Sequence, residues 1–184
     1  MNIDRRLDKV FSHALRLPWN KESRYVLISD CHRGCGTSND NFLKNQSLFY
    51  AALQYYYNEQ FTYIELGDGD ELWENRSIRQ IMEIHSDIFF FLSRFYQEGR
   101  LHMIYGNHDM IKRSESFAKE HCTSCFCSDR QERFPLFPGI RFHEGIILVS
   151  EEEGPDVCLT HGHQADFLNS SLWRLSRFLV RYVW

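Results

Sequence analysis

The sequence lacks the features that mark membrane-spanning, disordered or nucleic-acid-binding chains. Its 184 residues include only four prolines, and the formal net charge at pH 7 is -4, so no overall positive field attracts nucleic acid. The longest apolar stretches, residues 88–92 and 146–149, are far shorter than the roughly 20 residues that a membrane-spanning helix needs. No repeat or low-complexity segment interrupts the chain. These absences favour one globular domain over residues 1–184.

The N-terminus also lacks a secretory signal, because charged residues are spread through residues 1–17 and no apolar core precedes a small-residue cleavage site. We therefore expect a cytoplasmic protein whose six cysteines stay reduced. Cys122, Cys125 and Cys127 have the close spacing of zinc ligands, with His121 as a nearby fourth candidate. Structural zinc sites generally use two separated pairs, so free thiols in a loop or small core are the favoured alternative.

Apolar patterning alternates between short buried runs and stripes of helical period. The expected elements are strands at residues 25–29, 61–66, 101–105, 140–144, 146–149 and 157–160 and helices at 41–58, 78–98 and 168–184. Gly145 is expected at a tight turn. This order predicts an α/β fold with a parallel sheet whose strand ends share one edge.

Residues of the types that bind metals follow four of the expected strands. They are Asp30 and His32 after the first, Asp68 after the second, Asn107 and His108 after the third, and His161 and His163 after the last. Each residue alone has an ordinary explanation, because Asp and Asn are common in turns and helix caps. Their repetition at strand ends, where α/β sheets form their sites, predicts a centre for Mn, Fe or Zn.

The four motifs that carry these residues are SDCH, LGDGDELW, IYGNHD and LTHGH. They resemble the motifs of the calcineurin-like metallophosphoesterases over about residues 25–166. The acidic residue and Trp after the GD pair, and the aromatic residue before GNHD, are most similar to the branch that includes UDP-2,3-diacylglucosamine hydrolase. The resemblance implies a four-layer α/β/β/α sandwich that holds two divalent metal ions.

The resemblance also implies a metal-binding role for each matched residue. Asp30 and His32 would bind the first ion, and Asp68 would bridge both ions. Asn107 and His161 would bind the second ion.

Other residues are expected to contact the substrate. By the resemblance, His108 would be the catalytic imidazole beside the leaving group, and Asp109 would orient it. Arg33 can bind phosphate in a bidentate manner, although a solvated loop arginine fits the sequence equally well. His163 is expected near the substrate or behind the metal ligands.

Two features depart from the family pattern. The second motif ends in Asp70 and Glu71 where the family has one acidic residue, so neither is assigned as a ligand. The final Gly-His-x-His motif, which supplies one histidine to each metal in the family, does not follow residue 166. Because the sequence stops within a helical pattern, we expect this motif and the last strands to lie beyond Trp184.

The resulting hypothesis is a metal-dependent hydrolase of a phosphomonoester, phosphodiester or pyrophosphate bond, in which a metal-activated hydroxide attacks phosphorus. The substrate is a phosphate ester, with nucleotide-linked and lipid-linked forms both open. The final helix, 168–184, has arginines on one face and apolar residues on another, so it can touch a membrane surface or an acyl chain, or pack on its own domain or a second subunit. Asn75 and Arg76 after the second motif are further candidate phosphate contacts.

Two other function classes stay open. The chain can be a binding or regulatory module that keeps the fold without turnover, which the missing final motif makes a serious alternative. A nucleic-acid phosphodiesterase would share the metal chemistry, but the acidic balance disfavours it. The sequence does not indicate the natural substrate, the metal identity or the oligomeric state.

Overall fold

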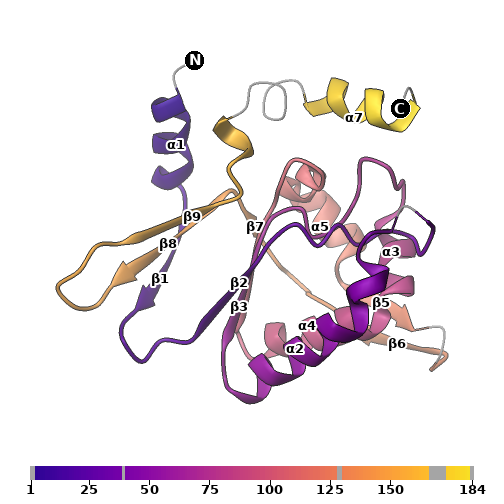
Figure 1. The fold of residues 1–184 in the computed structure, drawn as a ribbon, viewed down its shortest axis with the longest axis horizontal. Helices are drawn as coiled ribbons and strands as arrows, with labels where there is room; N and C mark the ends of the chain where they lie inside the picture. The colour runs from indigo at the N-terminus through magenta and orange to yellow at the C-terminus, as the bar shows by residue number, and fades with distance from the viewer. Residues whose placement is uncertain (1–2, 39, 128–129, 166–172, 183–184) are drawn as a thin grey trace.

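Two β-sheets lie face to face, and helices cover the outer side of the larger sheet (Figure 1). The computed structural model describes residues 3–38, 40–127, 130–165 and 173–182. The elements are α1 (Ile3–Ser12), β1 (Leu15–Trp19), β2 (Tyr25–Ile28), η1 (Leu43–Asn45), α2 (Gln46–Asn58), β3 (Thr62–Leu66), α3 (Ile78–Ile84), α4 (Ser86–Gln97), β4 (Leu101–Ile104), η2 (Met110–Arg113), α5 (Glu115–His121), β5 (Ser124–Cys127), β6 (Glu132–Pro135), β7 (Phe142–His143), β8 (Gly145–Ser150), β9 (Val157–Thr160), η3 (His163–Ala165) and α7 (Trp173–Tyr182). The expected α/β class is confirmed.

The larger sheet has the order β2-β3-β4-β7 and is parallel throughout. Its first three strands match the expected ones to within a residue or two at each end. β9 is different, because it pairs antiparallel with β8 in a second sheet of order β1-β8-β9. The expectation of one parallel sheet carrying all four strand ends is therefore wrong for the last strand.

Alternate residues of β3 face the two cores, as the two-residue period of a strand requires. Tyr63 packs among the apolar side chains of α2 and α4. Its neighbour Ile64 packs against Ile146 of β8 and Leu159 of β9, in the core between the sheets. Figure 1 shows the same layering, with β1, β8 and β9 on one side of β2 and β3 and with α2 and α4 on the other.

The helix expected at 78–98 is two helices, α3 and α4, that meet at His85. His85 is fully buried, and its Nε2 lies 2.9 Å from Asp40 Oδ2 while its Nδ1 lies 2.7 Å from Gln46 Oε1. The apolar stripe continues through both helices, so the sequence pattern predicts a single helix. The break occurs at His85, where the buried side chain makes its polar contacts. The helix expected at 41–58 likewise begins with a separate turn, η1, before α2.

Three further differences concern local features. Gly145 is not in a tight turn but is the first residue of β8. Because glycine has no side chain, Val10 of α1 can pack closely here; a Cβ at Gly145 would lie only 2.7 Å from Val10 Cγ1. α1 and β1 were not expected from the sequence. Of the final helix expected at 168–184, α7 confirms the described part, and residues 168–172 and 183–184 lie outside the described residues.

The cysteines after α5 are core thiols. Cys122, Cys125 and Cys127 are buried as free cysteines in the helix-covered core. The Cys125 thiol donates to the Met82 carbonyl oxygen, and Ser86 donates to Cys127. These contacts favour the small-core explanation over a zinc site.

Of the helices in the described part of the chain, none combines the length and apolar character needed to cross a bilayer.

Candidate metal centre

The loops after β2 and β3 stay paired beyond the strands, which brings their polar residues together. The Asp30 amide donates to the Gly67 carbonyl oxygen at 3.1 Å, and the His32 amide donates to the Asp68 carbonyl oxygen at 2.9 Å. The backbone of the third loop joins them, because the His108 amide donates to Asp68 Oδ1 at 2.9 Å. Asp68 is thus held between the two neighbouring loops.

Three of the expected ligands have left-handed backbone conformations. The φ angles are 54° at Asp30, 48° at His32 and 51° at Asp68. Such angles are uncommon for residues other than glycine and cost roughly 1–2 kcal/mol per residue. Strained residues of this kind concentrate at functional sites, and here they direct three polar side chains to one place.

Two glycines allow the loops to approach each other. A Cβ on Gly106 would lie 2.0 Å from Asp68 Oδ1, and a Cβ on Gly67 would lie 2.7 Å from His161 Cγ. Gly67 also has a positive φ of 96°. Any larger residue at either position would displace a candidate ligand.

Within the described residues, two groups of side chains could hold a metal ion. One is formed by His32, Asp68 and His108 and the other by Asp30, Asp68 and His161, each with ligand atoms within 4.8 Å of one another. Asp68 belongs to both groups, as expected of a bridging carboxylate. We call these five residues the edge cluster. Its grouping differs from the expected one in pairing His32 with His108 and Asp30 with His161.

Glu71 fixes the orientation of two of these histidines. Its carboxylate lies 2.8 Å from His32 Nδ1 and 2.9 Å from His108 Nδ1. Burial would raise the pKa of Glu71, but the hydrogen bonds from His108 and His32 outweigh it and lower the pKa to about 2. An ionised carboxylate only accepts hydrogen bonds, so both histidines carry a proton on Nδ1 and present Nε2 to the centre.

His161 faces Asp68 in a way that calls for a positive charge between them. Its Nδ1 lies 2.9 Å from the Leu66 carbonyl oxygen and therefore donates. In the neutral ring Nε2 is then an acceptor, yet it lies 3.2 Å from Asp68 Oδ2 and 3.2 Å from Asn107 Oδ1. Burial lowers the pKa of His161, but Asp68 outweighs it and the pKa is raised. A proton or a metal ion between Nε2 and Asp68 relieves the repulsion, and the donor set fits Mn, Fe or Zn.

Asn107 and His108 lie where the third strand ends, as expected. The Asn107 carbonyl oxygen accepts a hydrogen bond from Trp73 Nε1 at 2.7 Å. The Trp73 ring stacks on the His108 ring, with centroids 4.1 Å apart and planes 19° apart. His108 is consequently fixed on one face by Trp73 and at Nδ1 by Glu71.

The expected orienting role of Asp109 is wrong. Asp109 is fully buried, and its carboxylate accepts hydrogen bonds from the Gly106 amide at 2.7 Å and from Lys112 Nζ at 2.6 Å. It points into the protein because the residue after His108 turns to the opposite side of the loop. Glu71, which the sequence left unassigned, holds His108 instead.

Arg33 is neither a solvated loop residue nor a phosphate contact at the edge. It is fully buried, where its Nε donates to Asp70 at 2.7 Å and its two terminal nitrogens donate to Glu65 at 2.9 and 3.0 Å. Lys112 Nζ completes the arrangement at 2.6 Å from Asp70 and 2.6 Å from Asp109. We call Arg33, Glu65, Asp70, Asp109 and Lys112 the ion cluster.

Asp70 and Lys112 of the ion cluster stay charged despite their burial, whereas burial raises the pKa of Asp109. Burial opposes ionisation of Asp70, but the charges of Arg33 and Lys112 outweigh it and hold the pKa of Asp70 below its usual value. Burial likewise opposes the charge of Lys112, and Asp109, Asp70 and Glu65 together raise its pKa. The cluster ties the loops after β2, β3 and β4 to one another beneath the edge cluster.

His163 lies outside both ligand groups. Its ring centroid is 5.7 Å from that of His161 and 6.2 Å from that of Tyr105. Burial and the neighbouring His161 lower the pKa of His163 to about 4, so the ring is neutral at pH 7. Its buried Nδ1 has no hydrogen-bond partner among the described residues.

Five residues important to the site were not assigned from the sequence, namely Glu65, Asp70, Glu71, Trp73 and Lys112. Glu65 had a visible signal, because it is a carboxylate inside an otherwise apolar strand. Lys112 follows Asp109 by three residues, a spacing that allows an ion pair within one turn. Glu71 and Trp73 follow Asp68 in a loop, where spacing in the sequence does not show which way a side chain points.

Comparisons of the chain with family models, with curated proteins and with solved structures found no match. Function is therefore inferred from the site itself.

Proposed function

We propose that the chain is a metal-dependent phosphoesterase that hydrolyses a phosphomonoester, phosphodiester or pyrophosphate bond with two divalent ions, Mn, Fe or Zn. The observation that carries the proposal is that Asp68 belongs to two ligand groups at the meeting point of four strand ends. We also propose the finer architecture, a four-layer α/β/β/α sandwich of the calcineurin-like type. The two facing sheets with helices outside the larger one support it.

Metal ions bound at the edge cluster would generate a hydroxide nucleophile from water and neutralise charge on the phosphoryl oxygens. His32 and His161 present Nε2 as ligand atoms, and the carboxylates of Asp30 and Asp68 lie beside them. The side chain of Asp30 is 56% exposed, so this side of the cluster is open to a substrate.

His108 would donate a proton to the leaving oxygen. The Glu71 carboxylate accepts from Nδ1 and stabilises the positive charge of the imidazolium, while Trp73 fixes the plane of the ring. General-acid catalysis by a positioned side chain typically contributes 10²–10⁴-fold in rate. Substitution of His108 should therefore reduce turnover more than metal binding.

The proposal is tested by Mn²⁺ binding, measured by calorimetry, together with hydrolysis of a nitrophenyl phosphate ester. We expect Asp68→Asn to weaken Mn²⁺ binding at least 100-fold and to abolish hydrolysis, because the shared ligand is lost. His108→Ala should lose at least 100-fold in kcat and weaken Mn²⁺ binding less than Asp68→Asn does, because His108 belongs to only one of the two ligand groups. Asp156→Asn is the matched control, since Asp156 pairs with Arg16 at the exposed surface, and it should change neither quantity.

Two outcomes would contradict the proposal in different ways. Failure of the wild-type protein to bind Mn²⁺, Fe²⁺ or Zn²⁺ would refute the metal centre. Metal binding without hydrolysis of any mono-, di- or pyrophosphate ester would instead support a binding module without turnover.

A further inference from the structure

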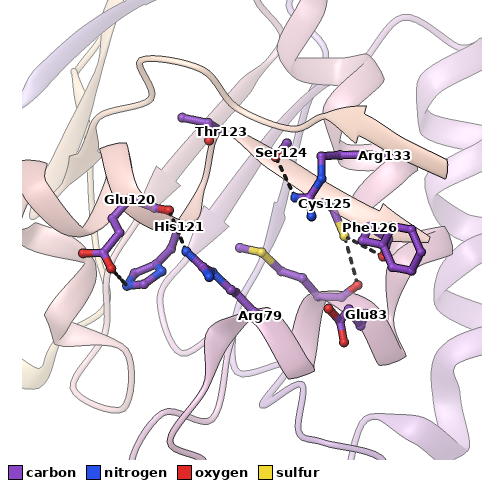
Figure 2. Close-up of a pocket in the computed structure, with 10 residues that line it drawn as sticks. Arg79, Glu83, Glu120, His121, Thr123, Ser124, Cys125, Phe126 and Arg133 are labelled. Atoms are coloured by element: carbon purple, nitrogen blue, oxygen red, sulfur yellow. Dashed lines mark hydrogen bonds and ion pairs between the residues drawn. The ribbon is translucent and has the colours of Figure 1, made fainter. Parts of the chain in front are cut away.

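Two adjoining cavities open beside the candidate centre, between α3, α5, β5 and α7. Their volumes are about 380 and 320 Å³, and Arg79, Glu120 and His121 line both. Figure 2 shows the larger cavity, in which the side chains of Arg79 and His121 lie next to each other. Cavities of this size accommodate small ligands.

The lining of the smaller cavity includes chain neighbours of Glu71 and Trp73, which hold the His108 imidazole. Leu72 and Asn75 line it, and Asn75 Nδ2 donates to the Glu71 carbonyl oxygen at 2.8 Å. Ile111, which also lines it, is three residues after His108 in the chain. A ligand in this cavity would therefore lie close to a phosphoryl group at the edge cluster.

The lining of the smaller cavity is cationic although the whole chain is acidic. Arg76, Arg79 and Arg177 line it together with one carboxylate, Glu120, whereas the formal net charge of the chain is -4. The larger cavity carries balanced charges, with Arg79 and Arg133 beside Glu83 and Glu120. An anion is accordingly favoured in the smaller cavity.

The hydrogen bonds of two of these arginines go to neutral groups. Arg76 Nη2 lies 3.3 Å from the Tyr182 hydroxyl of α7, and the guanidinium faces the Tyr182 ring at 5.7 Å. Arg79 Nη2 donates to the Glu120 carbonyl oxygen at 3.4 Å. Neutral acceptors leave the positive charge of a guanidinium uncompensated, and its planar donors match the oxygens of a phosphate group.

His121 provides a second, independent indication. Its Nδ1 is buried and has no hydrogen-bond partner among the residues described, and the ring packs edge-on to Phe117 at 4.8 Å. Nearly all buried polar atoms in proteins have a partner, and an exception calls for a bound molecule or another explanation. Its other ring nitrogen, Nε2, faces Glu120 Oε1 at 3.8 Å, so Nδ1 is the nitrogen that lacks a partner within the described residues.

We propose that the smaller cavity binds a second phosphate group of the substrate, held by Arg76, Arg79 and His121, while the scissile phosphate lies at the edge cluster. The assignment rests on the proposed phosphoesterase function and narrows its substrate class to compounds with two separated phosphate groups. It also accounts for how an acidic chain attracts an anionic substrate, since the positive field is local.

The site is tested first without metal, by titrating inorganic phosphate into the protein in the presence of a chelator and following ³¹P and histidine ring resonances. We expect phosphate binding that shifts the His121 signals and that weakens at least tenfold in the Arg76→Gln/Arg79→Gln double variant. Arg16→Gln, at an exposed ion pair in the other sheet, is the matched control and should bind as wild type does. Equal binding by the double variant and wild type would overturn the site.

The substrate class is tested by competition against nitrophenyl phosphate in the metal-loaded protein. Glucose 1,6-bisphosphate should inhibit at least tenfold more strongly than glucose 1-phosphate, and the double variant should lose this difference. Equal inhibition by the two sugars would overturn the assignment. Phosphate binding at the cavity without hydrolysis of any ester would overturn the proposed function and the substrate class, and would support an anion site alone.

Discussion

The edge cluster and the ion cluster share the loops after β2, β3 and β4, and His161 joins the edge cluster from the loop after β9. In the ion cluster each carboxylate touches a lysine or arginine, so the charges compensate one another in the interior. In the edge cluster the carboxylates and imidazole nitrogens face each other, and only a proton or a cation can lie between them. The difference shows how neighbouring residues can provide rigidity in one place and affinity for a metal in the other.

The two clusters alternate along the chain. Arg33 directly follows His32, and Asp109 directly follows His108. In each pair the second side chain goes inward to the ion cluster while the first remains at the edge. Each loop is thereby held by one residue while it presents another.

The largest difference between the two clusters is expected for Lys112→Met, which leaves Asp70 and Asp109 buried without the lysine that pairs with both. Uncompensated buried charges are strongly destabilising, and we expect the free energy of unfolding to fall by about 3–5 kcal/mol, measured by urea denaturation. Lys119→Met, on the exposed side of α5, is the matched control and should change it by no more than about 0.5 kcal/mol.

A second variant keeps the prediction testable if Lys112→Met fails to fold. Lys112→Met combined with Asp109→Asn removes one of the uncompensated charges and should recover part of the lost stability. A loss below about 1 kcal/mol in the single variant would contradict the account of the ion cluster.

At the edge cluster, Glu71→Gln should weaken metal binding. An amide no longer fixes both histidines with Nε2 facing the centre, and loss of such an orienting partner typically costs 10–100-fold in metal affinity. Calorimetry with Mn²⁺ measures it, and Glu74→Gln, an exposed residue of the same loop, is the control. Wild-type affinity in Glu71→Gln would show that the histidines are oriented by other contacts.

The smallest effect concerns Asp40, a buried carboxylate whose hydrogen-bond donors include His85 and the amides of Gly36, Phe42 and Leu43. Burial raises its pKa, but the Gly36 amide and His85 outweigh it, and the pKa is lowered from 3.8. The ionised form therefore stabilises the fold. We expect Asp40→Asn to cost about 2 kcal/mol at pH 7.

The pH dependence of that cost identifies its cause. A lowered pKa contributes stability that is fully present above pH 3.8 and is lost as the pH falls through the lower folded-state value. The difference between wild type and Asp40→Asn should thus shrink as the pH falls below about 3.8, as seen in urea denaturation at each pH. A difference that stays constant over this range would assign the cost to packing instead of charge.

The strand ends that form the site could be predicted from the sequence, because a short run of apolar residues followed directly by polar residues is a local signal. Asp30, His32, Asp68, Asn107 and His161 all come together near the expected edge. The direction of each loop side chain is a tertiary property, which is why Asp109 was assigned to the centre and Glu71 was not.

Other differences also come from contacts distant in the sequence. The helix break at His85 depends on Asp40 and Gln46, which lie on a loop and a helix that the local pattern cannot connect to it. The sheet to which β9 belongs is set by its pairing with β8. The pattern of apolar residues in β9 does not show this, because it fits a parallel or an antiparallel neighbour equally well. Arg33 was misread for a similar reason, because its partner Glu65 is in a different strand.

His161 approaches Asp68 from the opposite sheet, so the distance between their side chains depends on how Ile64 and Ile104 pack against Ile146 and Leu159. The candidate metal site is thereby coupled to the docking of the two sheets. A molecule whose sheets have not docked would carry the candidate ligands on both surfaces, too far apart to share one ion.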